Sequence, residues 1–219
     1  MVTDVVRDEL VRLGGGDPFV EVLRDAQAHQ LEHGCGLFPA GAAVMQLAAA
    51  FVRAANARSI LDLGCGIGYS TFWLAAAAGP DAHVTAIDDD ATHVDLARRH
   101  AERLGLDRRI DFVLGDVAEV LATFDGSVDA VHDDAWFATP PPHLDRMLEI
   151  LRPGGLVTMP NWFLLVDALT GAPRNDWRQW AGETWAADTI AYAELLAARA
   201  DITVTWTTTP PLATVTKHP

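Results

Sequence analysis

The feature that most constrains this chain is the stretch Ser59-Ile-Leu-Asp-Leu-Gly-Cys-Gly-Ile-Gly-Tyr-Ser70. It opens with a short apolar run, which predicts a buried β-strand, and a helix is predicted to begin near Tyr69. The intervening Gly64, Gly66 and Gly68 can adopt backbone angles that other residues disfavour, and they leave room for a ligand against the main chain. The stretch therefore predicts a strand, a glycine-rich turn suited to a ligand, and a helix.

The spacing of these glycines distinguishes between ligands. A dinucleotide fingerprint, G-x-G-x-x-G, counted from Gly64 would need a glycine at the position of Tyr69. The chain instead reads Asp-x-Gly-x-Gly-x-Gly, which begins at Asp62. This pattern resembles the first motif of class I S-adenosylmethionine-dependent methyltransferases. The resemblance implies that Asp62 holds the methionine end of the cofactor, which lies against Gly64 and Gly66. The alternative is an ordinary turn in which glycines only reverse the chain.

The composition limits the kind of partner. Half of the 219 residues (50%) are hydrophobic, enough for the core of one domain. With 30 acidic and 16 basic residues the formal charge is −14, which repels phosphate backbones, so we expect no nucleic-acid partner. Cys35 and Cys65 are too few for a disulfide framework. Because the sequence also shows no signal peptide and no membrane-spanning apolar run, we expect a cytoplasmic protein without a membrane contact.

Apolar strands alternate with amphipathic helices from residue 58 onward, which predicts a parallel sheet with helices on both faces. Strands are predicted at 59–64, 83–88, 110–115, 128–133 and 155–160, and helices at 69–78, 92–104, 117–124 and 140–151. After a predicted helix over 175–199, the strands predicted at 202–208 and 212–217 are joined so closely that they must pair antiparallel. The expected fold is α/β: a Rossmann-like seven-stranded sheet of five parallel strands plus a C-terminal antiparallel hairpin.

The N-terminal part of the chain is predicted to be helical throughout. Helices are predicted over 2–13, 17–33 and 40–56, and the first ends at consecutive glycines. We expect residues 1–39 to form an N-terminal helical cap and residues 40–219 to form the class I methyltransferase domain.

In an open parallel sheet the ligand lies outside the carboxyl ends of the strands. Asp88 follows the second predicted strand, where one carboxylate can accept hydrogen bonds from both ribose hydroxyls. Asp116 and Val117 follow the third, and they offer a polar contact and an apolar wall to the adenine. Asp133 and Asp134 follow the fourth, where they would face the positive sulfonium of the cofactor and the acceptor. For the last pair the alternative is a helix cap beside a surface acid.

A narrower resemblance rests on four segments of the chain. These are Leu61–Ser70, Val84–Asp88, Val128–Ala135 and Leu151–Val157. They are similar to the bacterial O-methyltransferase family related to catechol O-methyltransferase. The resemblance implies that Tyr69 and Ser70 contact the methionine end of the cofactor, and that the loop 36–39 closes over it.

The chain also departs from this family. Metal-dependent members bind Mg²⁺ through an Asp after the fourth strand and an Asp-Asn pair after the fifth. Asp134 and Asn161 match two of these ligands, but Pro160 stands at the middle one. A lysine that serves as the base falls on Phe137. Because the loss of a carboxylate removes charge that a hard dication needs, a divalent metal is not expected and no residue is assigned to one.

An acceptor hydroxyl needs a base that takes its proton. Asp134 and His143 are the catalytic residues predicted here, and Asp133 and His132 are further candidates at the same strand end. His143 follows consecutive prolines at the predicted start of a helix, where the helix dipole disfavours the charged imidazolium and keeps the ring available as a base. The alternative is a histidine on a helix surface.

Aromatic residues follow the fourth and fifth strands, and they would wall a flat acceptor, close the cofactor pocket or form a subunit interface. They are Trp136, Phe137, Trp162 and Phe163. A second group is expected to make core or dimer contacts. Its members are Trp177, Trp180, Trp185 and Trp206.

Three functions remain open at this point. The first is a homodimeric S-adenosylmethionine-dependent O-methyltransferase that acts on a small hydroxylated molecule with little or no metal dependence. The second is a protein that binds S-adenosylmethionine but has degenerate catalysis, because the metal ligands and the lysine are incomplete. The third is an NAD(P)-dependent oxidoreductase, against which Tyr69 and the C-terminal hairpin argue.

Overall fold

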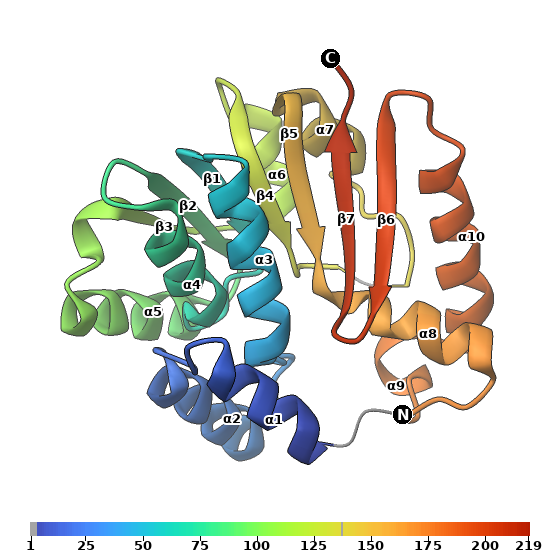
Figure 1. The fold of residues 1–219 in the computed structure, drawn as a ribbon, viewed down its shortest axis with the longest axis horizontal. Coiled ribbons are helices and arrows are strands. Elements are labelled where there is room, and N and C mark those ends of the chain that lie inside the picture. The colour runs from blue at the N-terminus through green and yellow to red at the C-terminus, as the bar shows by residue number, and fades with distance from the viewer. Residues whose placement is uncertain (1–3, 137) are drawn as a thin grey trace.

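A computed structural model describes residues 4–136 and 138–219 (Figure 1). Residues 1–3, within the first predicted helix, and Phe137, within the predicted aromatic group, lie outside this description. The strands are β1 (Ser59–Leu63), β2 (His83–Asp88), β3 (Ile110–Leu114), β4 (Val128–Asp133), β5 (Leu151–Met159), β6 (Ile202–Thr208) and β7 (Pro211–Lys217). The α-helices are α1 (Asp4–Leu13), α2 (Val20–His33), α3 (Ala42–Ala54), α4 (Tyr69–Ala78), α5 (Ala91–Leu104), α6 (Val117–Thr123), α7 (Leu144–Ile150), α8 (Phe163–Thr170), α9 (Arg178–Ala181) and α10 (Trp185–Ala197). Short 3₁₀ helices are η1 (Asp107–Arg109) and η2 (Pro160–Trp162).

The strands form one seven-stranded sheet in the order β3-β2-β1-β4-β5-β7-β6. Strands β1 to β5 pair in parallel, and β7 is antiparallel to both β5 and β6. The predicted fold, with its C-terminal hairpin, is therefore confirmed. The strand order reverses at β1, which lies between β2 and β4, and ligands of open α/β sheets bind at such a reversal.

Each face of the sheet has its own apolar core, because successive strand residues point to opposite faces. Ile60 of β1 belongs to a core that it shares with residues of α2, α3, α4 and α5. Leu61 and Leu63 belong to the opposite core, shared with residues of α6, α7 and α10. The helices thus cover both faces and fix the sheet between them (Figure 1).

The helices α1, α2, α8 and α9 gather at the end of the sheet toward which β5 runs (Figure 1). Phe19, Val22 and Ala26 are buried in the same core as α3 and α4, whereas no residue of α1 is buried. Gln46 of α3 connects to the N-terminal segment, since its side-chain amide donates to the carbonyl oxygens of Val11 (2.9 Å) and Gly16 (3.1 Å). The division into a cap (1–39) and a domain (40–219) stays a prediction.

Strand β5 begins at Leu151, earlier than the predicted start at 155, and it includes Pro153. Leu151 pairs with Val128 and Leu156 pairs with Ala130, so the residues between Leu151 and Leu156 bulge out of the ladder. A proline is tolerated in such a bulge because no partner strand uses its missing N–H. Arg152, Pro153 and Gly154, which were predicted to lie outside the strand, are the residues that form most of this bulge.

The predicted helix over 175–199 is wrong in its first part. It is divided into α9 and α10 by Gly182, which has a left-handed φ of +80°. The helix predicted over 140–151 is shortened to α7, because consecutive prolines lack N–H donors and restrict the residue before each of them. The sequence analysis missed α8. None of the described helices is long and apolar enough to cross a bilayer.

Candidate active site

A cleft of about 830 Å³ lies across the carboxyl ends of the parallel strands. Its volume is in the range of roughly 300–1,000 Å³ that is typical of small-molecule sites. Nine of the predicted site residues line it: Gly64, Gly66, Tyr69, Ser70, Asp88, Asp116, Val117, Asp134 and His143. The other two, Asp62 and Asp133, lie behind this wall, as described below. The structure therefore brings residues from four strand ends to one cavity.

The turn after β1 requires glycine for its backbone angles and for its close contacts. Gly64 and Gly68 have φ values of +76° and +94°. A Cβ atom on Gly64 would lie 2.8 Å from the backbone of Ala135, and one on Gly68 would lie 2.6 Å from the ring of Phe72. The N–H of Gly64 donates to the carbonyl of Ile87 at 2.9 Å, which ties the turn to β2. The turn is thus held rigidly against two neighbouring strand ends.

Asp62 is a fully buried carboxylate beneath this turn. Its Oδ2 accepts hydrogen bonds from the hydroxyls of Ser70 (2.8 Å) and Thr71 (2.5 Å). Its Oδ1 is buried and makes no hydrogen bond to any residue that the structure describes. Burial raises the pKa of Asp62 to about 6, against the two hydroxyl hydrogen bonds that lower it. A buried oxygen without a partner is costly, so it is an observation that points to a ligand donor.

Tyr69 and Ser70, which the resemblance places on the methionine end of the cofactor, both line the cleft but already have side-chain partners. The phenol of Tyr69 donates to Asp17 Oδ2 at 2.8 Å, which ties the start of α4 to the segment before α2. The hydroxyl of Ser70 is used by Asp62. Their contact with a cofactor stays a prediction, and the structure assigns both a part in orienting the turn.

Asp88 ends β2 and faces the cleft. Its Oδ2 accepts from the Gly66 N–H (2.8 Å), and its Oδ1 accepts from the Asp90 N–H (3.1 Å) and lies 3.2 Å from Nδ1 of His93. A carboxylate offers about four acceptor positions, so these contacts leave little unused capacity. To accept hydrogen bonds from both ribose hydroxyls, as predicted, the Asp88 oxygens would have to keep accepting from these neighbours as well.

The adenine side of the predicted site is formed by Asp116 and Val117. Asp116 caps α6, because its Oδ1 accepts from the Glu119 N–H at 3.0 Å. Val117 is half-buried and packs against the core that contains α6 and α7. The cap explains the Asp116 side chain structurally, while its place on the cleft wall agrees with the predicted adenine contact.

Asp133 and His143 form a buried pair that the sequence analysis did not predict. Nε2 of His143 lies 3.2 Å from Asp133 Oδ2, and the two side chains are only 2% and 3% exposed. His143 lines the cleft, whereas Asp133 lies behind it and faces a much smaller cavity. Asp133 therefore supports the histidine and is not on the wall of the predicted cofactor cleft. A histidine oriented by a carboxylate is the arrangement that general bases commonly have.

Asp134, the other predicted catalytic residue, is half-buried on the cleft wall. Its Oδ1 accepts from the amide of Asn161 at 2.7 Å. Burial raises the pKa of Asp134 well above its usual range, and the nearby carboxylates Asp62 and Asp133 raise it further. Asp134 already accepts from Asn161, whereas His143 lines the cleft and is oriented by Asp133, so the geometry favours His143 over Asp134 as the base.

The division of the aromatic residues between the core and the cleft wall differs from the predictions. Trp162 is buried, and its ring lies 5.2 Å from Tyr192, centroid to centroid, so it belongs to the core. Trp177 and Trp180, expected to be core or dimer contacts, belong to neither core and line the cleft instead. Trp136 and Phe163 also line it. The expectation of a core position is therefore wrong for Trp177 and Trp180.

The position of Trp177 depends on Asp167 of α8, which the sequence analysis missed. Asp167 is buried, and its Oδ2 accepts from the indole N–H of Trp177 at 2.7 Å. The ring of Trp177 lies 5.1 Å from that of Phe163. No local pattern indicated this contact, because α8 itself was not predicted.

The loop before α3 lies over the glycine turn, and its closure over the methionine end of the cofactor stays a prediction. Residues 35–40 line the cleft, and the side chain of Leu37 lies where a Cβ atom on Gly66 would be. Phe38 packs edge-on against Trp180, at 5.0 Å between ring centroids. This contact connects the loop with α9 across the cleft.

Sequence comparisons agree with this site. Residues 60–155 match a family described as a methyltransferase domain. Over 109 residues the chain is 30% identical to a catechol O-methyltransferase of Mycobacterium tuberculosis, and the match covers 49% of this chain and 50% of that protein. The match thus spans about half of that relative.

Solved methyltransferases share the fold along nearly the whole chain. The O-methyltransferase TomG from Streptomyces achromogenes, in complex with S-adenosylmethionine (SAM), is 23% identical, with a TM-score of 0.72 over 91% of this chain and 90% of that one. An O-methyltransferase from Bacillus cereus, in complex with SAH, is 21% identical, with a TM-score of 0.70 over 91% and 90%.

The fold is shared with solved methyltransferases, and residues 60–155, which include the glycine turn, match the methyltransferase domain family. The proteins that this chain resembles in sequence and in fold include O-methyltransferases, so the predicted resemblance is confirmed.

Proposed function

We propose that this chain is an S-adenosylmethionine-dependent O-methyltransferase that acts on a small hydroxylated molecule. The observation that carries the proposal is the single cleft that joins the glycine turn above Asp62 to His143. One end of this cleft offers acceptors for a cationic nucleoside, and the other offers a base among aromatic walls. Neither the family match nor the relatives favour a dinucleotide-dependent oxidoreductase.

The residues of the cleft fit the cofactor in its charge and its polarity. Asp62 lies behind the cleft wall, so its unpartnered Oδ1 would bind the ammonium group of the methionine moiety through a bridging water. Asp88 suits the ribose hydroxyls, and Val117 with Asp116 suits the adenine. When bound, the cofactor supplies an activated methyl group on its sulfonium, so the chain needs no electrophile of its own.

The chain's own part in the reaction is to position the acceptor and to remove its proton. His143 would take the proton of the acceptor hydroxyl, and Asp133 would hold the ring and stabilise its charged form. The rings of Trp136, Phe163 and Trp177 would exclude water from the cleft. They would also hold a flat acceptor, such as an aromatic ring.

We propose that a divalent metal has little or no part in this reaction. Pro160 cannot coordinate an ion, and the side-chain amide of Asn161 donates to Asp134 and to the carbonyl of Trp136 (3.1 Å). One carboxylate with one amide is a poor donor set for Mg²⁺.

Two measurements test this function. Calorimetric titration with S-adenosylmethionine, its demethylated product, NAD and NADP should show saturable binding of the first two only. A methyl-transfer screen of catechols, phenols, carboxylates and amines, with Mg²⁺ or with a chelator, should then show turnover that the chelator leaves unchanged. Saturation with a pyridine dinucleotide alone would overturn the proposal, and cofactor binding without turnover of any acceptor would support degenerate catalysis.

We also propose a cytoplasmic homodimer without nucleic-acid partners. The formal charge of −14 supports the lack of nucleic-acid partners. The helix α1 supports the dimer, because Leu10 and Leu13 expose 58% and 66% of their surface. Light scattering of the Leu10→Glu and Leu13→Glu variants tests this surface. If α1 forms the dimer interface, the mass of each variant in solution should fall to that of one chain.

A further inference from the structure

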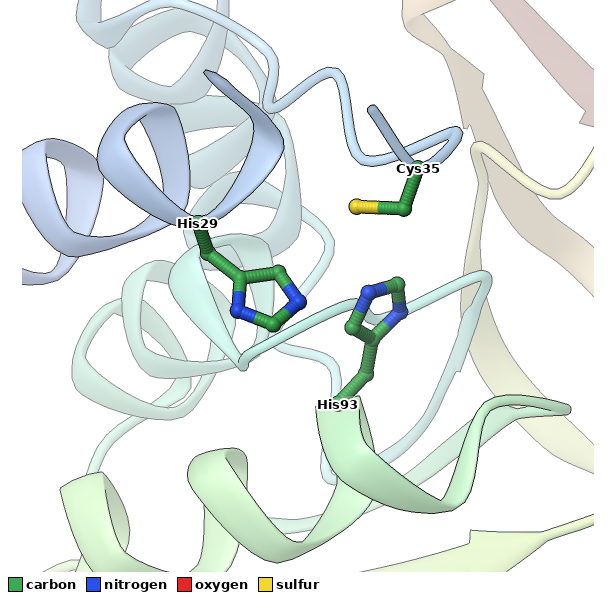
Figure 2. A group of neighbouring side chains, drawn as sticks. All are labelled: His29, Cys35 and His93. Carbon is green, nitrogen blue, oxygen red and sulfur yellow. The ribbon is translucent and has the colours of Figure 1, made fainter. Parts of the chain in front are cut away.

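A second group of metal-ligating side chains lies at the edge of the cleft, away from Asp134 and Asn161. It consists of His29 near the end of α2, Cys35 in the following loop and His93 in the first turns of α5. One ligand atom from each lies within 4.8 Å of the other two. Figure 2 shows the three side chains directed toward a common space between these segments.

We propose that His29, Cys35 and His93 bind a transition-metal ion, Zn²⁺ in preference to a hard dication. Imidazole nitrogen and thiolate sulfur are the donors that Zn²⁺ takes in proteins, whereas Mg²⁺ takes oxygen. A tetrahedral zinc ion holds such atoms roughly 3.3–3.7 Å apart. The three side chains must therefore close by about an ångström, and His29 and Cys35 are only half-buried, so they can turn. Water from the open cleft completes the coordination.

The state of His93 is the strongest support for this site. Its Nε2 is buried, and the described residues give it no hydrogen bond, while Nδ1 lies 3.2 Å from Asp88 Oδ1. A carboxylate that accepts from one ring nitrogen and leaves the other as a lone pair is the usual support of a metal-bound histidine. Asp88 would thus serve both the metal-binding histidine and the glycine turn.

Proton release should accompany metal uptake. The hydrogen bond to Asp88 raises the pKa of His93 to about 9, and Asp90 also faces this ring, with Nε2 at 3.9 Å from its carboxylate. The other groups that face His93 are the ring of His29, at 5.3 Å between centroids, and the thiol of Cys35. Because thiol and imidazolium groups must lose a proton to bind a metal ion, uptake of the ion should release protons.

An ion bound by His29, Cys35 and His93 would also affect the loop that covers the glycine turn. The ion would connect α2, the loop that contains Leu37, and α5 at the edge of the cleft. It would add to the existing contact between α2 and α5, in which Asp25 lies 3.7 Å from Arg103. Because Leu37 covers Gly66, the ion would fix the loop over the turn. The inference does not depend on the proposed methyl transfer, since metal binding can be measured without cofactor or acceptor.

Titration of the whole, untagged chain with Zn²⁺ and Co²⁺ tests the site. We expect one ion per chain, release of protons on binding, and a Co²⁺ spectrum with a thiolate charge-transfer band and tetrahedral d–d bands. Cys35→Ser should abolish the charge-transfer band although Cys65 remains, and His29→Ala should weaken binding at least ~100-fold. The control is His83→Ala, because His83 is an exposed histidine that pairs with Asp111 at 2.8 Å.

The outcomes separate a built site from weak surface binding. An unchanged affinity in Cys35→Ser, or an octahedral Co²⁺ spectrum without the charge-transfer band in the unaltered chain, would overturn the proposal. The Co²⁺ spectrum is measured on the unaltered chain, so this test remains valid even if a variant folds poorly. Equal losses in His29→Ala and His83→Ala would likewise count against this site.

Discussion

Asp62 has opposite effects on folding and on ligand binding: its buried carboxylate lowers the stability of the unliganded protein, and the same group is proposed to bind the cofactor. It is fully buried, one of its oxygens is unpartnered among the described residues, and burial raises its pKa to about 6. Side chains that lower the stability of the unliganded protein are commonly retained for function. The two roles can be separated by removing the charge and keeping the shape.

Asp62→Asn should change stability and ligand binding in opposite senses. Because the folded-state pKa of about 6 is above the ordinary 3.8, the protonated carboxyl stabilises the fold below pH 3.8, and this contribution is lost as the pH rises through 6. The free energy of unfolding of the variant, relative to the unaltered chain, should rise by about 2 kcal/mol between pH 4 and pH 7. Urea unfolding at both pH values measures it, with the exposed Asp81→Asn as control.

The same variant should bind S-adenosylmethionine about 10- to 100-fold more weakly, because it loses a charged hydrogen-bond acceptor. Calorimetry at pH 7.5 measures the affinity. Unchanged affinity would mean that Asp62 does not help to bind the ammonium group.

His143→Gln should lower kcat by about 10²–10⁴-fold if the histidine is the base. Asp133→Asn should lower it less and should shift the pH at which the rate rises, because Asp133 acts through the ring it orients. Rates over pH 5–9, with cofactor affinity as the control, distinguish the two roles. A loss of cofactor affinity equal to the loss of rate would instead indicate that His143 has a structural part.

At the scale of single elements, the turn between β1 and α4 shows how far backbone geometry, and not side-chain chemistry, shapes the site. Its glycines have left-handed φ values. The backbone of Ala135 occupies the space that a Cβ on Gly64 would need, and side chains occupy that space at Gly66 and Gly68. A left-handed φ alone costs an ordinary residue roughly 1–2 kcal/mol. Any further cost must come from the close contacts.

Comparing Gly64→Ala with Gly105→Ala separates these two costs. Both glycines have left-handed φ values, +76° and +68°, but nothing lies within 4 Å of a Cβ on Gly105. Gly105→Ala should cost about 1–2 kcal/mol of unfolding free energy. Gly64→Ala should cost more and abolish cofactor binding, since the backbone of Ala135 must move. Chemical unfolding of both variants measures the difference, and equal costs would contradict the close-packing argument.

The sequence predicted elements that have a clear period and missed those defined by tertiary contacts. The strand ends at Asp88 and Asp133 were correct, and the end of the first strand was predicted one residue late, because apolar runs and turn residues mark these ends locally. The bulge in β5 was not predictable, since it depends on pairing with β4.

The same distinction applies to the site. The glycine turn and Asp88 are marked by local spacing, so they were found from the sequence. The pairs Asp133–His143 and Asp88–His93 join residues ten and five positions apart that no motif connects. Only the fold brings His29 and Cys35 beside His93, which is why that cluster was missed.

For the whole molecule, the open question is how much of the N-terminal region belongs to the catalytic domain. The core contains Phe19, Val22 and Leu37, which all precede the predicted boundary at residue 40. By contrast, α1 buries no residue and is held by Gln46. The physical boundary should therefore lie between α1 and α2.

Two truncations test this boundary. Removing residues 1–16 should cost only about 1 kcal/mol, because it removes mainly the hydrogen bonds of Gln46 and no buried side chain of α1. Removing residues 1–39 also takes away Phe19, Val22 and Leu37, whose burial is worth about 1.5–3 kcal/mol each, and the Asp17 partner of Tyr69. That loss is a large share of the roughly 5–15 kcal/mol that stabilises a domain, so the longer truncation should unfold or lose cofactor binding. Circular dichroism melting and calorimetry with S-adenosylmethionine measure both effects. A 40–219 fragment that melts cooperatively and binds the cofactor normally would show instead that the first helices form an independent cap.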